Sequence, residues 1–248
     1  MAVNRRPLKP VLVVVHGLGD RAAAWEGFRA ALGSDLDVRL FDLPGHGHAP
    51  RSDDYRYPAL VEAVVEATVE LDRFALLGHS VGGAVAWLFA ARHPERVSHL
   101  ILEEPAAPHQ SPFIQGPTLE PRHPYTYASP AKIADMMNGL DPTFTEADAR
   151  ASHVQRPDGR WEPDFDPALF PALVEDAREN GPAYRAELAR IQAPTLLVRG
   201  DRSFARPGQM EEIAAEIPGA RLLTLGGGHF LHRERTELLA RAVKEFLA

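Results

Sequence analysis

The sequence predicts an α/β protein with a mostly parallel, doubly wound sheet and a helical insertion. Short apolar runs alternate with amphipathic segments, which is the pattern of strand–helix repeats. The runs are continuously apolar, as expected for strands covered on both faces. By contrast, 13 of the 22 prolines lie between Pro105 and Pro182. Proline removes backbone donors and stops helices, so regular repeats cannot continue through that third of the chain.

Six apolar runs predict the strands of the core, at residues 11–15, 37–41, 74–78, 99–103, 195–199 and 220–225. The amphipathic segments predict helices at about 21–32, 57–71, 81–92, 208–217 and 234–247. We therefore assign residues 1–105 and 188–248 to the core. Residues 106–187 are predicted to form a helical lid, because they leave the sheet directly after the fourth strand. A packing subdomain with no role at the site is the alternative.

Composition excludes several classes of protein. The 248-residue chain is 45% hydrophobic with a net charge of −7, and it has no basic cluster that could follow a nucleic-acid backbone. It has no cysteine for disulfides or thiolate metal sites. No histidine pair has a supporting carboxylate at metal-ligand spacing, so we predict no metal and no cofactor. The apolar run Val11 to Val15 is too short for a leader or membrane span, so we expect a soluble, cytoplasmic protein without a membrane partner.

The segment Gly78-His79-Ser80-Val81-Gly82 is a G-x-S-x-G motif. An apolar strand precedes it and a helical pattern follows it. In that context the chain turns sharply and presents the serine hydroxyl at the carboxyl edge of the sheet. The motif therefore indicates a nucleophile, the alternative being a glycine-rich turn with an incidental serine.

Three further segments resemble those of the α/β-hydrolase family. "VVVHGLGD" is similar to the family's oxyanion strand, "FDLPGHGHA" to its D-x-P-G-H-G loop, and "GGGHF" to its terminal histidine loop. The resemblance covers nearly all of the chain outside the predicted lid. One departure stands out: only ten residues precede the first core strand. We therefore expect a core that lacks the family's first strands.

The resemblance implies further site residues. A serine needs a base to take its proton, and the family places that base at His229. His232, three residues on, is the alternative, although its position suggests the start of the last helix. The oxyanion requires two backbone donors. By resemblance these are the N–H groups of Leu18 and Val81, the latter directly after Ser80.

The base also needs an acid that orients it and stabilises its positive charge, which completes a catalytic triad. Two positions in the sequence could supply this acid. The family most often places an aspartate after the penultimate strand, but the expected positions hold Ser203 and Phe204, and Asp201 comes early. Some lactone hydrolases and haloalkane dehalogenases of this family instead carry the acid earlier in the chain. In them it follows the strand that comes after the nucleophile's helix, which is the helix predicted here at about 81–92. There this chain has Glu104, with Glu103 facing the other way because side chains alternate along a strand. We favour Glu104, with Asp201 as the runner-up; a salt-bridged strand end is the alternative for Glu104.

The predicted function is that of a serine hydrolase cleaving a carboxylic ester or lactone of an apolar small molecule. A Ser-His-Glu triad and an acyl-enzyme would carry the reaction. Carbon–carbon bond hydrolases, thioesterases, amidases or peptidases of the same fold remain alternatives, as does a non-enzymatic ligand receptor. A dinucleotide-binding oxidoreductase is disfavoured because no G-x-G-x-x-G follows the first strand. The sequence does not predict the oligomeric state.

The candidate substrate-binding residues are Met136, Met137, Trp161 and Phe204.

Overall fold

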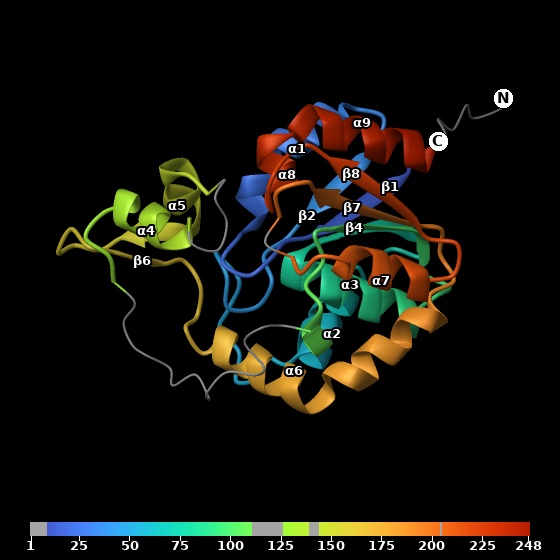
Figure 1. Cartoon of the computed structure of the whole chain (residues 1–248), viewed down its shortest axis with the longest axis horizontal. Coiled ribbons are helices and arrows are strands. Elements are labelled where there is room, and N and C mark those ends of the chain that lie inside the picture. Colours follow the sequence, from blue (N-terminus) through green and yellow to red (C-terminus); the bar gives the residue numbers. More distant parts are fainter. Residues whose placement is uncertain (1–8, 111–125, 139–143, 204) are drawn as a thin grey trace, which may run out of the picture.

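A six-stranded parallel sheet forms the centre of the molecule (Figure 1). The computed structural model describes residues 9–110, 126–138, 144–203 and 205–248. The strand order is β2-β1-β3-β4-β7-β8, and every neighbouring pair is parallel. The predicted fold class is therefore confirmed. The strands are β1 (Val11–Val15), β2 (Asp37–Leu40), β3 (Phe74–His79), β4 (Val97–Glu103), β7 (Thr195–Gly200) and β8 (Arg221–Leu225).

Helices cover both faces of the sheet (Figure 1). One face carries η1 (Ala22–Trp25), α1 (Glu26–Leu32) and α9 (Thr236–Leu247), whose buried side chains share one hydrophobic cluster. The other face carries α2 (Tyr57–Ala67), α3 (Ser80–Arg92) and α7 (Gln209–Glu216), which share the larger cluster. Within the described ranges, no helix is long and apolar enough to cross a bilayer.

Strand residues alternate between these two clusters even though their sequences read as continuous apolar runs. In β4, Leu100 and Leu102 pack into the larger cluster, whereas Ile101 packs into the cluster under α1 and α9. This alternation continues to the end of the strand. It directs Glu103 toward the α1 and α9 face and leaves Glu104 at the carboxyl edge of the sheet.

The segment between β4 and β7 is only partly helical. It contains η2 (Pro108–Gln110), α4 (Pro130–Met137), α5 (Glu146–Ser152), β5 (His153–Gln155), β6 (Trp161–Pro163), α6 (Leu169–Ala186) and η4 (Glu187–Arg190). The antiparallel β5–β6 pair was not expected from the sequence. Three-residue strands are too short to show a period of two, so the sequence pattern could not predict them.

This inserted segment has two parts. Helix α6 buries Leu169, Leu173 and Ala177 in the larger hydrophobic cluster of the core. Helices α4 and α5 and strand β6 instead project to one side of the molecule (Figure 1). They surround a small cluster of their own, made by Ile133, Ala134, Phe144 and Ala149.

The strand order determines where a ligand can enter. From β1 the chain passes to β2 on one side, and then returns to β3 on the other side of β1. At such a switch point the connections leave in opposite directions, which opens a crevice outside the carboxyl ends of the strands. The G-x-S-x-G motif, at the end of β3, and the loop after β1 both lie at this switch point of the strand order.

Candidate active site

Ser80 occupies a strained turn between β3 and α3. Its φ angle is 52°, in the left-handed region that non-glycine residues rarely adopt. The turn is also tightly packed: a Cβ atom on Gly78 would lie 2.3 Å from the Gly82 carbonyl oxygen, and one on Gly82 would lie 2.3 Å from the His16 carbonyl oxygen. Only glycine fits at these two positions. The backbone therefore forms the strand–turn–helix expected for a nucleophile elbow.

The structure brings His229 and Glu104 together. His229 follows β8 on the glycine loop, and its Nδ1 lies 3.4 Å from Glu104 Oε2. The Glu104 side chain is fully buried and the His229 side chain is 8% exposed. Glu104 Oε1 accepts the Gly200 N–H at 2.6 Å, and Oε2 accepts the Ser203 hydroxyl. Because each carboxylate oxygen has a donor, Glu104 can remain buried beside the imidazole.

Asp201, the runner-up acid, lies in a different environment. Its side chain is half exposed and its carboxylate accepts the Gly227 N–H at 2.8 Å. Arg202 lies 3.3 Å from the same oxygen. Asp201 therefore binds the backbone of the glycine loop that carries His229, and so supports that loop.

The loop after β1 forms a tight turn against the elbow. The Asp20 N–H donates to the Gly17 carbonyl at 3.2 Å, and the Gly19 N–H donates to His46 Nε2 at 3.2 Å. A Cβ atom on Gly17 would lie 3.0 Å from the Ser80 Cβ atom, so the turn contacts the serine closely. Among the residues that the structure describes, none accepts a hydrogen bond from the Leu18 N–H.

Val81 lies in the first turn of α3, where backbone N–H groups have no helical acceptor. The same helix end carries partial positive charge. Leu18 lies on the turn that contacts Ser80 and Val81 directly follows Ser80, so their N–H groups remain the predicted oxyanion donors.

Two neutral histidines support this turn. His16 Nδ1 donates to the Gly17 carbonyl at 2.9 Å, and its Nε2 accepts the Leu43 N–H at 2.9 Å. Burial lowers the pKa of His16 and, with His16 nearby, lowers the pKa of His46 to about 3. Both rings are therefore neutral, as an acceptor nitrogen requires.

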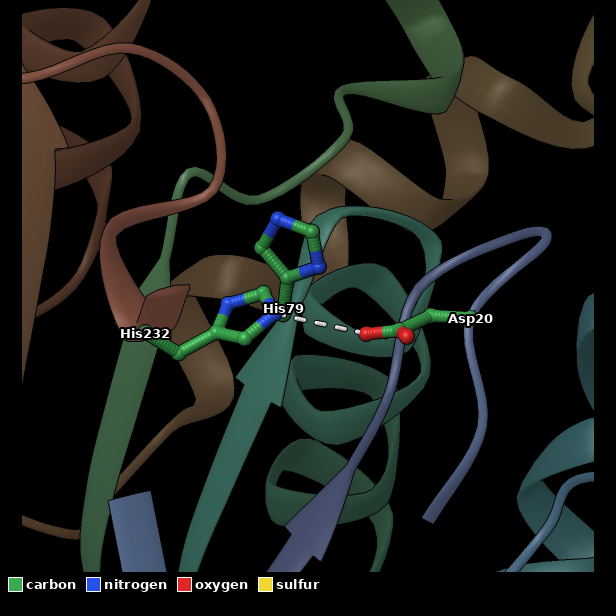
Figure 2. Close-up of side chains that lie close together, drawn as sticks. All are labelled: Asp20, His79 and His232. Atoms are coloured by element: carbon green, nitrogen blue, oxygen red, sulfur yellow. Dashed lines mark ion pairs between the residues drawn. The ribbon is translucent and has the colours of Figure 1, made fainter. Parts of the chain in front are cut away.

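His232, the alternative base, is enclosed beneath the site. Its Nδ1 lies 2.9 Å from Glu103 Oε1, and its side chain has no exposed surface. Its Nε2 lies 3.4 Å from Asp20 Oδ2 (Figure 2). The ring also stacks on Trp25 at 4.0 Å between centroids. Burial alone would lower the pKa of His232, but Glu103 and Asp20 outweigh it and raise the pKa. The two carboxylates thus favour the protonated, charged form of His232.

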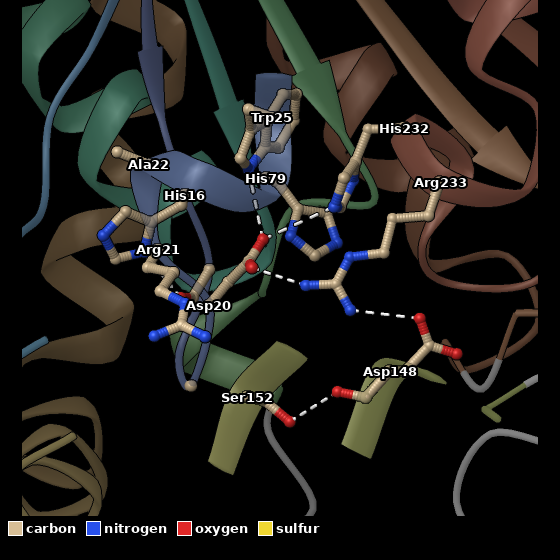
Figure 3. A network of polar contacts seen from close by, with 12 residues as sticks. His16, Asp20, Arg21, Ala22, Trp25, His79, Asp148, Ser152, His232 and Arg233 are labelled. Carbon is tan, nitrogen blue, oxygen red and sulfur yellow. Dashed lines mark hydrogen bonds and ion pairs between the residues drawn. The ribbon is translucent and has the colours of Figure 1, made fainter. Parts of the chain in front are cut away.

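The same cluster could be considered as a metal site. Asp20, His79 and His232 can each offer a ligand atom, and these atoms lie within 4.8 Å of one another (Figure 2). However, Arg233 already donates to the Asp20 carboxylate (Figure 3). Two positive side chains, Arg233 and His232, therefore neutralise the acids, and a further cation would have to displace them. We interpret the group as a buried ion-pair cluster.

His79, the residue before the nucleophile, links the elbow to the loop of the base. Its Nε2 donates to the His229 carbonyl at 3.0 Å, and the two rings are 4.7 Å apart. Burial, with His229 and His232 nearby, holds the pKa of His79 well below 6.5. Within the described residues its Nδ1 has no hydrogen-bond partner. The neutral ring thus positions the His229 backbone.

The candidate substrate-binding residues lie mostly around the small cluster of the inserted segment. Met137 and Trp161 pack against it, whereas Met136 is 48% exposed and accepts a hydrogen bond from Tyr127 Oη at 3.5 Å. Phe204 lies outside the described residues.

Phe230, which the sequence analysis did not consider, connects the base to the inserted segment. Its ring lies 5.2 Å from the ring of His229 and 5.7 Å from that of Phe144. An aromatic residue directly after the predicted base was the available signal, and it was overlooked.

Comparison with known proteins shows the family to which the chain belongs. The model of the alpha/beta hydrolase fold matches residues 10–236, so the chain belongs to the alpha/beta hydrolase fold family. Among its relatives is a putative esterase/lipase of Haemophilus influenzae, 26% identical over 96% of this chain and 83% of that protein. A pimeloyl-[acyl-carrier protein] methyl ester esterase of Neisseria meningitidis is 28% identical, over 94% of this chain and 75% of that one.

A solved structure extends the likeness. The enol-lactonase of Burkholderia xenovorans aligns with a TM-score of 0.76 and 25% identity, covering 98% of this chain and 93% of the other. The likeness thus covers the inserted segment as well as the core.

Proposed function

We propose that the chain is a serine hydrolase that cleaves carboxylic esters or lactones through Ser80, His229 and Glu104. The observation that carries this proposal is the buried Glu104 carboxylate 3.4 Å from His229 Nδ1, at the crevice where Ser80 occupies its strained turn. The named esterases and the enol-lactonase among its relatives support an ester bond as the target.

The reaction has two halves. Ser80 Oγ attacks the acyl carbon while His229 Nε2 takes the hydroxyl proton, and the N–H groups of Leu18 and Val81 bind the oxyanion. The carbon–oxygen bond of the ester then breaks, and His229 returns the proton to the leaving alcohol. Water attacks the acyl-Ser80 ester with His229 again as base, which releases the acid and restores Ser80. Glu104 stabilises the imidazolium formed in each half.

We further propose that the projecting part of residues 106–187 acts as a lid over an apolar substrate. Phe144 and Phe230 are in contact, so apolar surface of this part reaches the base. Met136, Met137, Trp161 and Phe204 are the candidate substrate contacts. An apolar lining with a few polar groups is typical of small-molecule sites.

The first test is the nucleophile. Purified wild-type protein is expected to hydrolyse p-nitrophenyl esters, and Ser80→Ala is expected to lower kcat by at least about 10³-fold, because the attacking oxygen is lost. Ser98→Ala is the matched control, since Ser98 lies within β4, and it should keep wild-type turnover. Turnover retained in Ser80→Ala would contradict the mechanism. A folded wild-type protein without turnover would favour the receptor alternative.

The second test separates the two acids. Glu104→Gln is expected to lower kcat by about 10²- to 10⁴-fold, because the imidazolium loses its charged partner. Asp201→Asn is expected to change kcat less than about 5-fold and to act through the glycine loop. Steady-state kinetics on p-nitrophenyl butyrate measures both. The reverse ranking would assign the acid to Asp201.

A further inference from the structure

We propose that Asp20 is a positioning residue. It holds the turn of residues 17–20, which carries the Leu18 N–H and is called the oxyanion turn below, in place relative to the loop after β8 that carries the proposed base His229. This inference rests on the proposed function and adds a role that Ser80, His229 and Glu104 do not supply. It concerns where the Leu18 N–H is placed with respect to His229.

The backbone of Asp20 closes the oxyanion turn. Its N–H donates to the Gly17 carbonyl at 3.2 Å, and Leu18 lies between these two residues. On the opposite side, the Gly19 N–H binds His46 Nε2 at 3.2 Å. The position of Leu18 therefore depends on a turn whose last residue is Asp20.

The side chain of Asp20 reaches away from this turn, into the segment that follows the base. Its Oδ2 accepts Trp25 Nε1–H at 3.1 Å and lies 3.4 Å from His232 Nε2, and its Oδ1 accepts the Arg233 guanidinium (Figure 3). His232 and Arg233 both belong to α8 (Leu231–Glu234), which begins two residues after His229. One carboxylate thus joins the oxyanion turn to the loop of the base.

Charge makes this connection firm. Burial would raise the pKa of Asp20, but the close contact with His232 and the charge of Arg233 lower it far below its usual range. Glu103 and Asp20 together balance His232 and Arg233 in a buried cluster. Separating one of these side chains from the others would leave a buried charge without a partner, which is energetically costly. The four side chains are therefore held in one fixed geometry.

The kinetic consequence follows from when the oxyanion forms. The Leu18 N–H binds the oxygen most strongly in the transition state, so a misplaced turn lowers kcat and leaves ground-state binding nearly unchanged. A purely structural acid would instead lower the stability of the fold without this kinetic signature.

The experiment compares Asp20→Asn with Asp176→Asn. Asp176 is a matched control, because it is equally buried at 2% exposure but lies in α6, where it binds the Tyr57 N–H and the Tyr184 hydroxyl. Each variant is assayed with p-nitrophenyl butyrate and with paraoxon, whose phosphoryl oxygen enters the oxyanion site when the serine is phosphorylated. Thermal unfolding reports the stability of both.

Asp20→Asn is expected to lower kcat by about 10- to 100-fold with KM within about 3-fold, less than the loss of a whole oxyanion donor. The rate of inactivation by paraoxon should fall in parallel. Asp176→Asn should lower the melting temperature but change neither rate. Equal kcat in the two variants, or a loss confined to KM, would overturn the inference while leaving the proposed function intact. Absence of wild-type turnover would overturn both.

Arg233→Lys provides the test if Asp20→Asn does not fold, because it keeps the charge but cannot bind Asp20 and Asp148 together as the guanidinium does. It is expected to lower kcat and the paraoxon rate in the same direction as Asp20→Asn, by a smaller factor. Unchanged kcat in Arg233→Lys would count against the inference.

Discussion

The Ser203 hydroxyl donates to Glu104 Oε2, the oxygen that also faces His229 Nδ1. Ser203 stands where the family resemblance would place an aspartate. Two carboxylates at this point would repel one another, and one would be protonated. A hydroxyl at residue 203 is compatible with an acid at Glu104, directly after β4, because the hydroxyl donates a hydrogen bond to the carboxylate. The identity of residue 203 and the position of the acid are therefore linked.

Ser203→Ala is accordingly expected to lower kcat/KM by about 3- to 10-fold, because a hydrogen bond to a buried charge contributes about 1.5–3 kcal/mol, part of which orients the acid. Ser203→Thr keeps a hydroxyl and should restore most of the activity. Adding Ser203→Ala to Glu104→Gln tests whether the two residues are coupled. If Ser203→Ala lowers kcat/KM by the same factor in Glu104→Gln as in wild type, Ser203 acts independently of Glu104.

Individual site residues could be predicted from the sequence where they belong to a recognisable motif. The G-x-S-x-G motif identified Ser80 as the candidate nucleophile, and the terminal glycine loop identified His229 as the candidate base. Strand alternation separated Glu103 from Glu104, and the structure places them on opposite sides as expected. The role we infer for Asp20 could not be predicted, since its partners at 232 and 233 are more than 200 residues away.

Among the elements, α5 and α8 form a direct electrostatic contact between the inserted segment and the core. Arg233 binds Asp148 at 3.1 Å as well as Asp20 (Figure 3). Asp148 also forms a capping box with Thr145 at the start of α5. One acid thus fixes both the beginning of α5 and its contact with α8.

Asp148→Asn is expected to loosen α5, because the pairing with Arg233 loses its charge while an amide can still cap the helix. KM should rise about 2- to 5-fold with little change in kcat, and limited proteolysis between 126 and 165 should become faster. Asp135→Asn is the matched control, since Asp135 is 66% exposed and pairs with Lys132 on the surface. Equal behaviour of the two variants would contradict a contact specific to Asp148.

The elements differ in how well the sequence predicted them. The six core strands were predicted to within about two residues, because both faces of the sheet are apolar and the runs are unambiguous. In the inserted segment the prolines obscure the pattern. Helix α6 continues past Gly181 and through Pro182 to Ala186, although proline usually ends a helix. Its burial against the core maintains it where local propensity alone would not.

For the whole molecule, buried histidines determine the response to acid. The pKa values of His16, His46 and His79 are lowered mainly by burial, that of His46 to about 3, so the His46 side chain stays neutral at pH 5 in the folded state. In the unfolded chain they bind protons below about pH 6.5. Their contribution to stability is present above that pH and is lost as the pH falls. The pKa of His232 is raised by Glu103 and Asp20 against the effect of burial, so its contribution to stability has the opposite pH dependence and is lost as the pH rises.

The free energy of unfolding is therefore expected to fall between pH 7 and pH 5, by about 2 kcal/mol for each histidine that remains neutral. Urea unfolding of wild type and His46→Asn at both pH values measures this. The pH dependence should be about 2 kcal/mol smaller in His46→Asn. His48→Asn, at an exposed position of the same loop, should keep the wild-type dependence. Identical dependence in all three proteins would contradict the assignment.

The end of β4 has a practical consequence for redesign. Because Glu103 and Glu104 face opposite sides of one strand end, the two histidines of a single loop, His229 and His232, are both held from the rigid centre of the sheet. In our mechanism the loop after β7 contributes one hydroxyl and no acid. That loop could be lengthened beyond Ser203 to alter substrate choice without moving the proposed triad, provided that Ser203 and Asp201, which binds the Gly227 N–H, are kept.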